Sequence, residues 1–316
     1  MTTYESKYGK LYGIRECELH GNGIIKECSL DKKSELNTAY GILIPQFDFS
    51  NPRKKPNYCI SFYESGALRK VSLDKKTDIC TQIGVISAEL LTFYESGSIK
   101  RLFPLNGHLS AYWEENDEYQ LAEEMLFECS FGRFSAKVIV ISFYEDGKVK
   151  DITFWPNERI NLITPVGECR VRIGLSLYPD GSLKSIEPSS PIQVKTPIGT
   201  ISAFDITANG ISGEINSLSF TPDGSVKSFL TSTQQIIVKV KDNKERIIGP
   251  VQTQDVDGLE IAFRPLSVEL TENSMILNKE EFNYNEYSFT IVPYHKKGKN
   301  QCTDCANCSG CDVSFA

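Results

Sequence analysis

The stretch Ile60-Ser-Phe-Tyr-Glu-Ser-Gly-Ala-Leu-Arg69 recurs along the chain in nearly the same form. Strand-favouring residues and an aromatic residue or Leu lead into a turn that ends in Gly. An aliphatic residue and then a basic residue follow the turn. Further copies begin at Leu91, Ile141, Leu175 and Leu218, and a degenerate copy covers residues 18–26. Because self-similarity of this kind sets the architecture, we expect a repeat protein.

Each copy predicts a β-hairpin that closes on its glycine, since Gly can adopt the positive φ that such turns require. The later copies contain Pro-Asp-Gly, in which Pro presets the turn and Asp bonds its own backbone. Apolar residues of the return strand are spaced by three, as in Ile99 and Leu102. This spacing breaks strict alternation and predicts a β-bulge beside the turn. A helix so close to the turn is the alternative.

A second phrase, Thr-x-x-Gly, precedes hairpins at residues 81–84, 164–167 and 196–199, with a looser relative at residues 39–44. One unit is therefore a short strand, a connection and a hairpin. The longest insertion lies between Gly97 and Gly147, and insertions in solenoids often form the binding face. It holds Trp113 and the acidic stretch 114–118. We expect either a solvated turn or a single helical turn, or else an acidic, aromatic loop that contacts a partner.

The predicted fold class is all-β, with repeated β-hairpins forming an elongated sheet or an open β-solenoid. We expect a hairpin array over residues 1–235 and an atypical β capping region over residues 236–293, because the open edge of an array must be covered. A flexible linker and a cysteine-rich tail are expected over residues 294–316. Residues 278–284 are expected to form one helical turn at most.

The phrase Phe-Tyr-Glu-Ser-Gly-x-x-Lys, present at residues 93–100, resembles the MORN-variant repeat of bacterial proteins. In that family an aromatic residue, a turn glycine and a basic residue mark successive hairpins. The resemblance covers residues 18–230 at the hairpins. It implies a hairpin-repeat sheet, and some members look like antitoxin or scaffold proteins. It implies no catalytic residues.

The chain carries four cysteines at uniform two-residue gaps near its end: Cys302, Cys305, Cys308 and Cys311. Thiolates at this spacing can turn toward one centre, so we expect these four residues to be metal ligands. The run resembles the Cys-x-x-Cys-x-x-Cys part of bacterial ferredoxins, which implies a 4Fe-4S cluster. It departs from that motif because the fourth cysteine follows after two residues instead of three, and no Pro comes next.

Zinc is the alternative metal for this tail, although the spacer 306–307 is short for tetrahedral closure. His295 could replace one thiolate, and an ordinary surface histidine is the other interpretation. Without a metal, the tail would be a disordered segment, or it would carry disulfide, redox or thioether chemistry. The sequence leaves these alternatives open.

A basic residue follows each hairpin turn, and in a regular array these residues would stack into a row. They are Lys26, Arg69, Lys100, Lys150, Lys184 and Lys227. The row is either a solvated ladder that protects the sheet from aggregation or a strip that binds an anionic partner. Asp255-Val-Asp-Gly258 begins like a calcium loop but lacks the later ligands of an EF-hand, so we interpret it as a β-turn.

Composition and charge exclude several classes of protein. The chain has 316 residues, of which 40% are hydrophobic and 24% charged, as in ordinary globular proteins. A net charge of −7 disfavours nucleic-acid binding. No apolar run is long enough to cross a bilayer, and residues 1–7 lack the apolar core of a secretion signal. We therefore expect a cytoplasmic protein with reduced thiols and no membrane partner.

Six further cysteines are scattered among strand-type residues and are expected to pack as small, inert hydrophobic groups. They are Cys17, Cys28, Cys59, Cys80, Cys129 and Cys169.

No Ser-His-Asp arrangement, phosphate-binding glycine loop or dinucleotide motif stands out, which makes a non-enzyme the favoured class. We expect a non-catalytic binding or scaffold protein that engages a protein partner and carries a metal or iron–sulfur centre in its tail. One alternative is a redox or electron-transfer accessory that acts through the cysteine tail. The other is a purely structural repeat protein with an inert tail.

Overall fold

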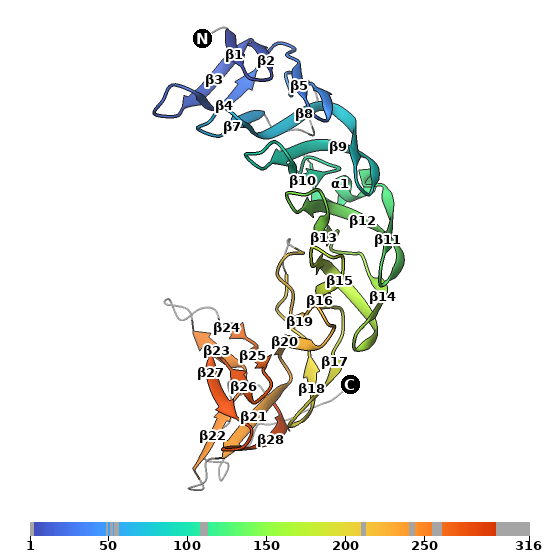
Figure 1. The fold of residues 1–316 in the computed structure, drawn as a ribbon, viewed down its shortest axis with the longest axis vertical. Helices are drawn as coiled ribbons and strands as arrows, with labels where there is room; N and C mark the ends of the chain where they lie inside the picture. Colours follow the sequence, from blue (N-terminus) through green and yellow to red (C-terminus); the bar gives the residue numbers. More distant parts are fainter. Residues whose placement is uncertain are drawn as a thin grey trace, which may run out of the picture.

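A computed structural model describes residues 3–294 apart from 49, 51–52, 54–56, 108–112, 210–212, 240–243 and 255–260. The protein is nearly all-β and forms a long, curved stack of hairpins that follows the order of the sequence (Figure 1). The predicted all-β hairpin-repeat fold is therefore confirmed. The cysteine tail lies outside the described residues.

One antiparallel sheet, the main sheet, runs the length of the molecule. Among the described residues no pairing joins its first strand to its last, so the sheet is open. In order across the sheet its strands are β3 (Ile14–Leu19), β4 (Ile25–Leu30), β7 (Ile60–Phe62), β8 (Leu68–Thr81), β9 (Gly84–Phe93), β10 (Ile99–Phe103), β12 (Gly132–Phe143), β13 (Val149–Phe154), β15 (Gly167–Leu177), β16 (Leu183–Pro188), β19 (Leu218–Phe220), β20 (Val226–Thr231), β25 (Leu266–Leu270), β26 (Ser274–Leu277) and β27 (Glu280–Asn283).

A second row of hairpins covers one face of the main sheet, and each of its turns is built on the Thr-x-x-Gly phrase or a close variant. Three of these hairpins are separate strand pairs, whereas the others are extensions of long main-sheet strands. The separate pairs are β1 (Thr3–Ser6) with β2 (Gly9–Tyr12), β5 (Leu36–Thr38) with β6 (Gly41–Leu43), and β17 (Ile192–Thr196) with β18 (Gly199–Ala203). The extensions are the outer halves of β8 and β9, β11 (Glu124–Cys129) with β12, and β14 (Ile160–Thr164) with β15.

The remaining elements lie in the longest insertion and near the C-terminal end of the described chain. The insertion forms one short helix, α1 (Glu115–Leu121), ahead of β11. A separate sheet contains β22 (Glu245–Ile248), β21 (Gln234–Lys239) and β28 (Ser288–Pro293), and β23 (Val251–Gln254) pairs with β24 (Ile261–Arg264). Within the described residues, no helix is long and apolar enough to span a bilayer.

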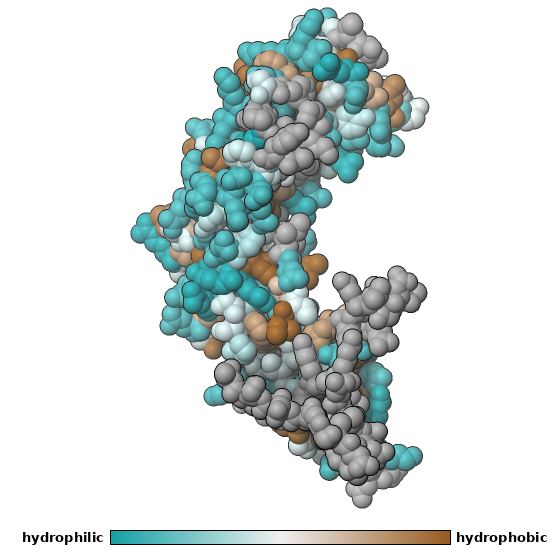
Figure 2. All heavy atoms as spheres, turned by 180° about the vertical axis from the view of Figure 1, so that it is seen from behind, coloured by the Kyte–Doolittle hydropathy of each residue, from teal (hydrophilic) through white to brown (hydrophobic). Residues whose placement is uncertain are grey.

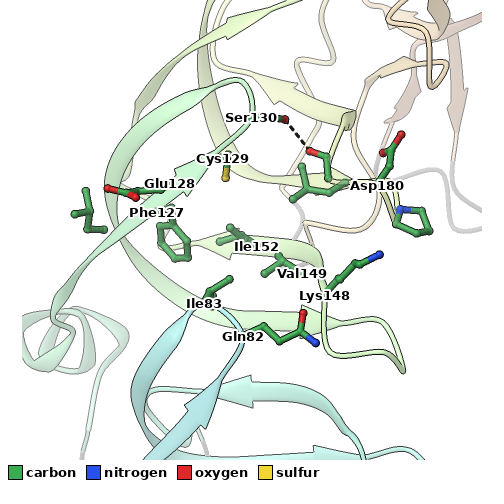
Figure 3. A pocket seen from close by; sticks show the side chains of 14 residues that line it. Gln82, Ile83, Phe127, Glu128, Cys129, Ser130, Lys148, Val149, Ile152 and Asp180 are labelled. Carbon is green, nitrogen blue, oxygen red and sulfur yellow. Dashed lines mark hydrogen bonds between the residues drawn. The ribbon is translucent and has the colours of Figure 1, made fainter.

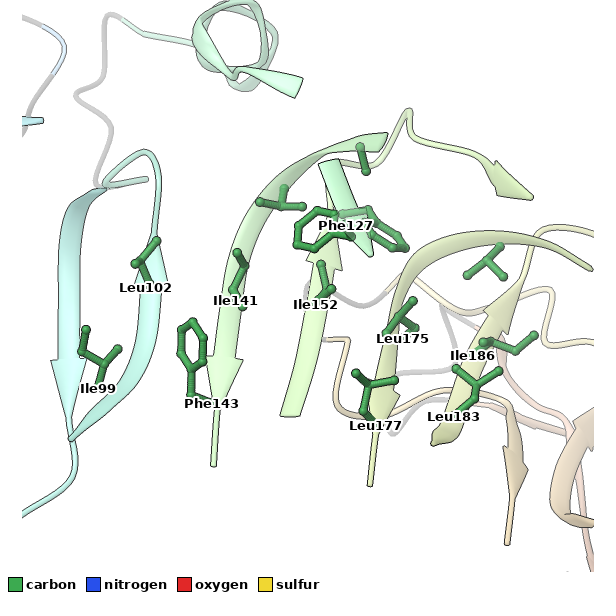
Figure 4. Close-up of a cluster of buried hydrophobic side chains, with 14 of the residues drawn as sticks. Ile99, Leu102, Phe127, Ile141, Phe143, Ile152, Leu175, Leu177, Leu183 and Ile186 are labelled. Carbon is green, nitrogen blue, oxygen red and sulfur yellow. The ribbon is translucent and has the colours of Figure 1, made fainter. Parts of the chain in front are cut away.

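The hydrophobic core lies between the two rows of hairpins. Inward-facing side chains of the main sheet, such as Ile141 and Leu175, meet side chains of the second row, such as Phe127 (Figure 4). The residue that precedes each turn tyrosine is fully buried, as in Phe62 and Phe93. Seen from behind, the surface is largely hydrophilic, and exposed hydrophobic residues form small separate patches (Figure 2). Because only one face of the main sheet is buried, hydrophobic and polar residues alternate along the strands of the repeat.

The bulge predicted from the spacing of three is confirmed in every copy of the repeat. In β10, for example, Ile99 is opposite Phe93 whereas Arg101 is opposite Thr92, so Lys100 is the extra residue. The same register shift occurs beside the other hairpin turns. The turn glycines also have positive φ, as at Gly97 (92°). The helical turn expected over residues 278–284 is wrong, because these residues close and begin the β26–β27 hairpin.

Tyrosine hydroxyls link each repeat to the next. The hydroxyl of Tyr63 donates a hydrogen bond of 2.8 Å to the carbonyl of Phe93, which directly precedes the tyrosine of the following repeat. Tyr94, Tyr144 and Tyr178 bond the next repeat in the same way, at 2.8 Å each. His20 occupies the corresponding place in the degenerate first copy, where its Nε2 lies 3.0 Å from the carbonyl of Phe62. This inter-repeat tyrosine bond explains why the aromatic residue recurs.

The second row is fastened to the main sheet by contacts from the tips of its hairpins, which we call tip contacts. The hydroxyl of Tyr8 accepts a hydrogen bond of 3.0 Å from the backbone N–H of Leu68, and Tyr40 does the same for Ile99. Later tips use other groups, since Gln82 donates to the carbonyl of Asp146 at 2.6 Å. These three tips therefore contact main-sheet hairpins that come later in the sequence.

Removing one inter-repeat tyrosine bond is expected to destabilise the array measurably. The Tyr94→Phe variant should lose about 1 kcal/mol of unfolding free energy, because one hydrogen bond is lost without a change in packing. Urea denaturation followed by circular dichroism measures this loss. Tyr12→Phe is the matched control, since Tyr12 is exposed and no hydrogen bond of its hydroxyl occurs among the described residues. Equal stabilities of the two variants would contradict the role assigned to Tyr94.

Candidate functional site

Cavities recur along the array between successive tip contacts. The first lies between Tyr8 and Tyr40 and has a volume of about 300 Å³. The second lies between Tyr40 and Gln82 and measures about 320 Å³. The third lies between Gln82 and Ser130 and is about 660 Å³. We call this third cavity the Ile83 groove, and because it is the largest of these three it is the candidate binding site.

The Ile83 groove is wide because one hairpin tip does not pack inward. In five of the six second-row turns, the third residue packs against the core. These residues are Tyr8, Tyr40, Phe131, Val166 and Ile198. Ile83 occupies this place in the turn at residues 81–84 but remains 42% exposed. In addition, the neighbouring tip contacts use Gln82 and Ser130, which are smaller than tyrosine. In the first cavity, the tyrosines of the two neighbouring tip contacts narrow the space between the tips. In the Ile83 groove, the corresponding space stays open.

The floor of the groove is apolar and its rim is polar (Figure 3). Phe127, Val149 and Ile152 lie at the floor, and all three belong to the core or pack against it. Lys148 and Asp180 stand at the rim. The Ser130 hydroxyl donates a hydrogen bond of 3.0 Å to the carbonyl of Gly181, which fixes one end of the groove. An apolar cleft with a few polar groups at its edge suits a large hydrophobic side chain of a ligand.

Two exposed hydrophobic residues lie at the groove. Leu126 on β11 is 51% exposed and lines the groove together with Ile83. Single exposed hydrophobic residues are common, but two of them at one cleft are typical of an interaction site.

The groove has no group suited to nucleophilic chemistry among its described lining residues. Burial raises the pKa of the Cys129 thiol to about 11, so it stays protonated near neutral pH. No histidine lines the groove, and Lys148 pairs with Asp146 at 3.4 Å on the surface. The part of the chain that the structure describes also contains no group of three potential metal ligands.

The tail residues predicted to bind metal cannot be placed. Cys302, Cys305, Cys308 and Cys311 lie outside the described residues, as do His295 and the segment 255–258. Their metal chemistry stays a prediction.

Of the six other cysteines, Cys28, Cys59 and Cys169 are buried and free, as the prediction of structural thiols requires. Cys129 is half-buried in the groove. Cys17 and Cys80 are exposed, so packing does not explain these two positions.

The basic residues after the turns do not form one uniform row. Lys26 pairs with Glu18 at 2.9 Å, and Lys150 pairs with Glu214 at 2.5 Å. This pairing lowers the pKa of Glu214. The other members include Arg69, Lys100 and Lys184, and each of these lies over the ring of its own turn tyrosine.

The long insertion contributes both to the groove and to a buried ion cluster. Its strand β11 supplies Leu126 and Phe127 to the groove. Its helix α1 carries Glu118, which is 1% exposed and paired with Arg53. The indole N–H of Trp113 donates a hydrogen bond of 3.0 Å to the same carboxylate. Trp113 is therefore a half-buried structural residue, whereas β11, the strand after α1, supplies lining residues of the groove.

Sequence reasoning missed the groove, although one signal was present. The turn at residues 81–84 carries Gln-Ile where the earlier turns carry a tyrosine. The sequence does not indicate that Leu126 is exposed, because its exposure depends on the pairing of β11 with β12.

Comparison with protein-family models, with curated proteins and with solved structures gives no match for this chain. The resemblance of the hairpin phrase to MORN-variant repeats therefore stays a prediction.

Proposed function

We propose that this protein is a non-catalytic binding scaffold, and that the Ile83 groove holds a large apolar side chain of a protein partner. The observation that carries the proposal is the widened cavity between two tip contacts, with an apolar floor and exposed Ile83 and Leu126 beside it. The hairpin array supports this function because it holds the walls of the groove on paired strands.

The chemistry of the groove defines the partner. A buried aromatic or branched aliphatic anchor fits the apolar floor, since anchors of this kind dominate protein interfaces. The charged residues that line the groove are Glu128, Lys148 and Asp180, so both signs are present and the partner segment beside the anchor is expected to carry polar residues. A protein partner of this kind agrees with the acidic net charge, which disfavours nucleic acid.

Selection of peptides from a random displayed library tests this proposal without knowledge of the natural partner. Selected peptides should contain a hydrophobic anchor and should bind the Ile83→Asp/Leu126→Asp variant at least about tenfold more weakly than the unmodified protein. The reason is that two charges at the mouth of the groove would be desolvated by the anchor. Fluorescence anisotropy gives the dissociation constants.

Ile163→Asp is the matched control, because Ile163 is an exposed aliphatic residue on β14 that does not line the groove. The control should bind the selected peptides as the unmodified protein does. Peptides that bind the double variant as tightly as the control would overturn the assignment of the groove.

The tail belongs to the same proposal as a metal or iron–sulfur site. The support is the sequence alone, in which Cys302, Cys305, Cys308 and Cys311 follow one another at two-residue gaps. The redox alternative would make this tail the active part and the array its support. The third alternative, a structural protein with an inert tail, requires that neither the groove nor the tail binds a ligand.

Metal analysis with a visible spectrum of anaerobically purified protein distinguishes these alternatives. Iron and sulfide that disappear in the Cys305→Ser/Cys308→Ser variant would identify a cluster, and zinc that disappears would identify a zinc site. We expect one of these two results. Protein that contains neither metal would refute the metal site and leave the hairpin array as the functional part.

A further inference from the structure

The bulges place two successive residues of each return strand on the outer face of the main sheet, away from the core. Because the bulge lets two residues oppose one, both side chains point to the same side. The second residue of each pair aligns with the outward-facing residue of the neighbouring strand, as Lys70 does with Ser61 and Arg101 with Thr92. The outer face therefore carries one two-residue step for each hairpin.

Only two of these steps are doubly basic, and they are neighbours. Arg69-Lys70 lies on β8 and Lys100-Arg101 lies on β10, with Thr92 of β9 between them. The other steps pair a lysine with an acidic residue or serine: Lys26-Glu27, Lys150-Asp151, Lys184-Ser185 and Lys227-Ser228. A concentration of positive charge therefore occurs at one place on an acidic protein, whose net charge is −7.

The two basic steps line a shallow cavity of about 290 Å³, which we call the basic pocket. All four cations line it, together with Ser61, Tyr63 and Thr92, and Glu27 is the one acidic residue among the lining residues. Arg69 and Lys100 lie over the rings of Tyr63 and Tyr94, at 5.9 and 5.4 Å from the ring centres. These contacts orient the two cations but do not neutralise their positive charge.

Few carboxylates neutralise this charge. Arg101 lies 3.8 Å from Glu214, which already bonds Lys150 at the shorter distance of 2.5 Å. For Arg69, Lys70 and Lys100, no ion pair occurs within the described part of the chain. Uncompensated cations that converge on one pocket favour an anionic ligand.

An unsatisfied hydroxyl points to the same conclusion. The Oγ1 atom of Thr92 is buried and has no hydrogen-bond partner among the described residues. A buried hydroxyl without a partner is unfavourable, so such groups are usually bonded. Thr92 lies between the two basic steps and lines the pocket. A ligand oxygen that reached this hydroxyl would provide the missing partner.

We infer that the basic pocket binds a phosphate group of a soluble ligand. Arg69, Lys70, Lys100 and Arg101 supply four positive charges, and the hydroxyls of Ser61 and Thr92 add neutral donors. A carboxylate offers one negative charge and two oxygens, which is too little for this donor set. A phosphate or diphosphate group offers two or more charges and at least three oxygens, and arginine bonds it in a bidentate manner. This inference concerns residues outside the Ile83 groove and does not depend on the proposed function.

Isothermal titration with inorganic diphosphate at low salt, about 50 mM NaCl, tests the inference directly. Saturable binding is expected for the full chain and should weaken as salt is raised. The Lys70→Gln/Arg101→Gln variant should bind diphosphate more than about tenfold more weakly, because charge-assisted hydrogen bonds are lost. Lys184→Gln/Lys227→Gln removes the same charge from two other steps and should bind normally.

Thr92→Val separates binding from folding. The substitution removes the unsatisfied hydroxyl at nearly constant volume, so thermal stability should be kept or raised while diphosphate binds several-fold more weakly. Inorganic phosphate in place of diphosphate shows whether one phosphate group suffices, and its saturable binding would also support the site.

Three results would overturn the inference. The first is the absence of saturable binding of diphosphate to the unmodified chain. The second is equal weakening in the two double variants, which would indicate nonspecific attraction. The third is binding of succinate as tight as that of diphosphate, which would show that a carboxylate satisfies the pocket.

Discussion

Arg53→Met is expected to lower the free energy of unfolding by about 3–5 kcal/mol, because it removes the guanidinium that bonds two buried carboxylates. The guanidinium of Arg53 donates to Glu118 through Nε at 2.7 Å and to Glu89 through Nη2 at 2.7 Å. All three side chains are nearly inaccessible to solvent. Bidentate geometry on both carboxylates makes this cluster much stronger than a surface ion pair. Chemical denaturation measures the loss.

Arg133→Met is the matched control for this prediction. Arg133 is exposed and lies 3.5 Å from Glu128, so its removal should change stability by no more than about 1 kcal/mol. Replacing Glu89 and Glu118 by Gln in the Arg53→Met background should restore part of the stability, since two buried negative charges are then removed. An Arg53→Met protein as stable as the control would show that the cluster does not support the fold.

Phe93→Ala is expected to cost about 3–5 kcal/mol, since it removes a buried aromatic side chain and leaves a cavity in the core. Phe93 is 2% exposed, and its ring lies 6.2 Å from the ring of Tyr40, which makes a tip contact. Its carbonyl also accepts the inter-repeat bond from Tyr63. The position therefore joins the main sheet, the second row and the preceding repeat. The thermal midpoint and urea denaturation report the change.

Leu126→Ala provides the comparison for Phe93→Ala, because Leu126 is large and apolar but half-exposed at the Ile83 groove. Its loss should change stability by less than about 1 kcal/mol, since little buried area is removed. Similar losses in the two variants would contradict the placement of the core between the two rows of hairpins.

The hairpins and their bulges could be predicted because both depend on local sequence. Gly97 closes a turn, and the spacing of Ile99 and Leu102 identifies the extra residue opposite β9. The helical turn predicted at residues 278–284 failed for a local reason as well. Asn278 and Lys279 both adopt positive φ, at 47° and 75°, and form the two-residue turn of a hairpin. Asn favours such a turn, whereas Lys gives no warning of it.

The Ile83 groove could not be predicted, because it depends on contacts between distant segments. The sequence shows that residues 81–84 form a turn but not that Ile83 stays outside the core. Part of the floor comes from Phe127 on β11, whose position depends on the pairing of β11 with β12. The basic pocket could be predicted from the sequence only in part. Arg69-Lys70 and Lys100-Arg101 are visible in the sequence, but their meeting across Thr92 requires the register of β8, β9 and β10.

Methyl NMR of the full chain, with Ile, Leu and Val methyl groups labelled, tests the binding function most directly. A peptide selected on the unmodified protein should shift the signals of Ile83, Leu126, Val149 and Ile152, which line the Ile83 groove. The signals of Ile42 and Ile163, which are exposed on other hairpins, should stay in place. Shifts confined to residues outside the groove, with Ile83 and Leu126 unchanged, would contradict the proposal that this groove is the binding site.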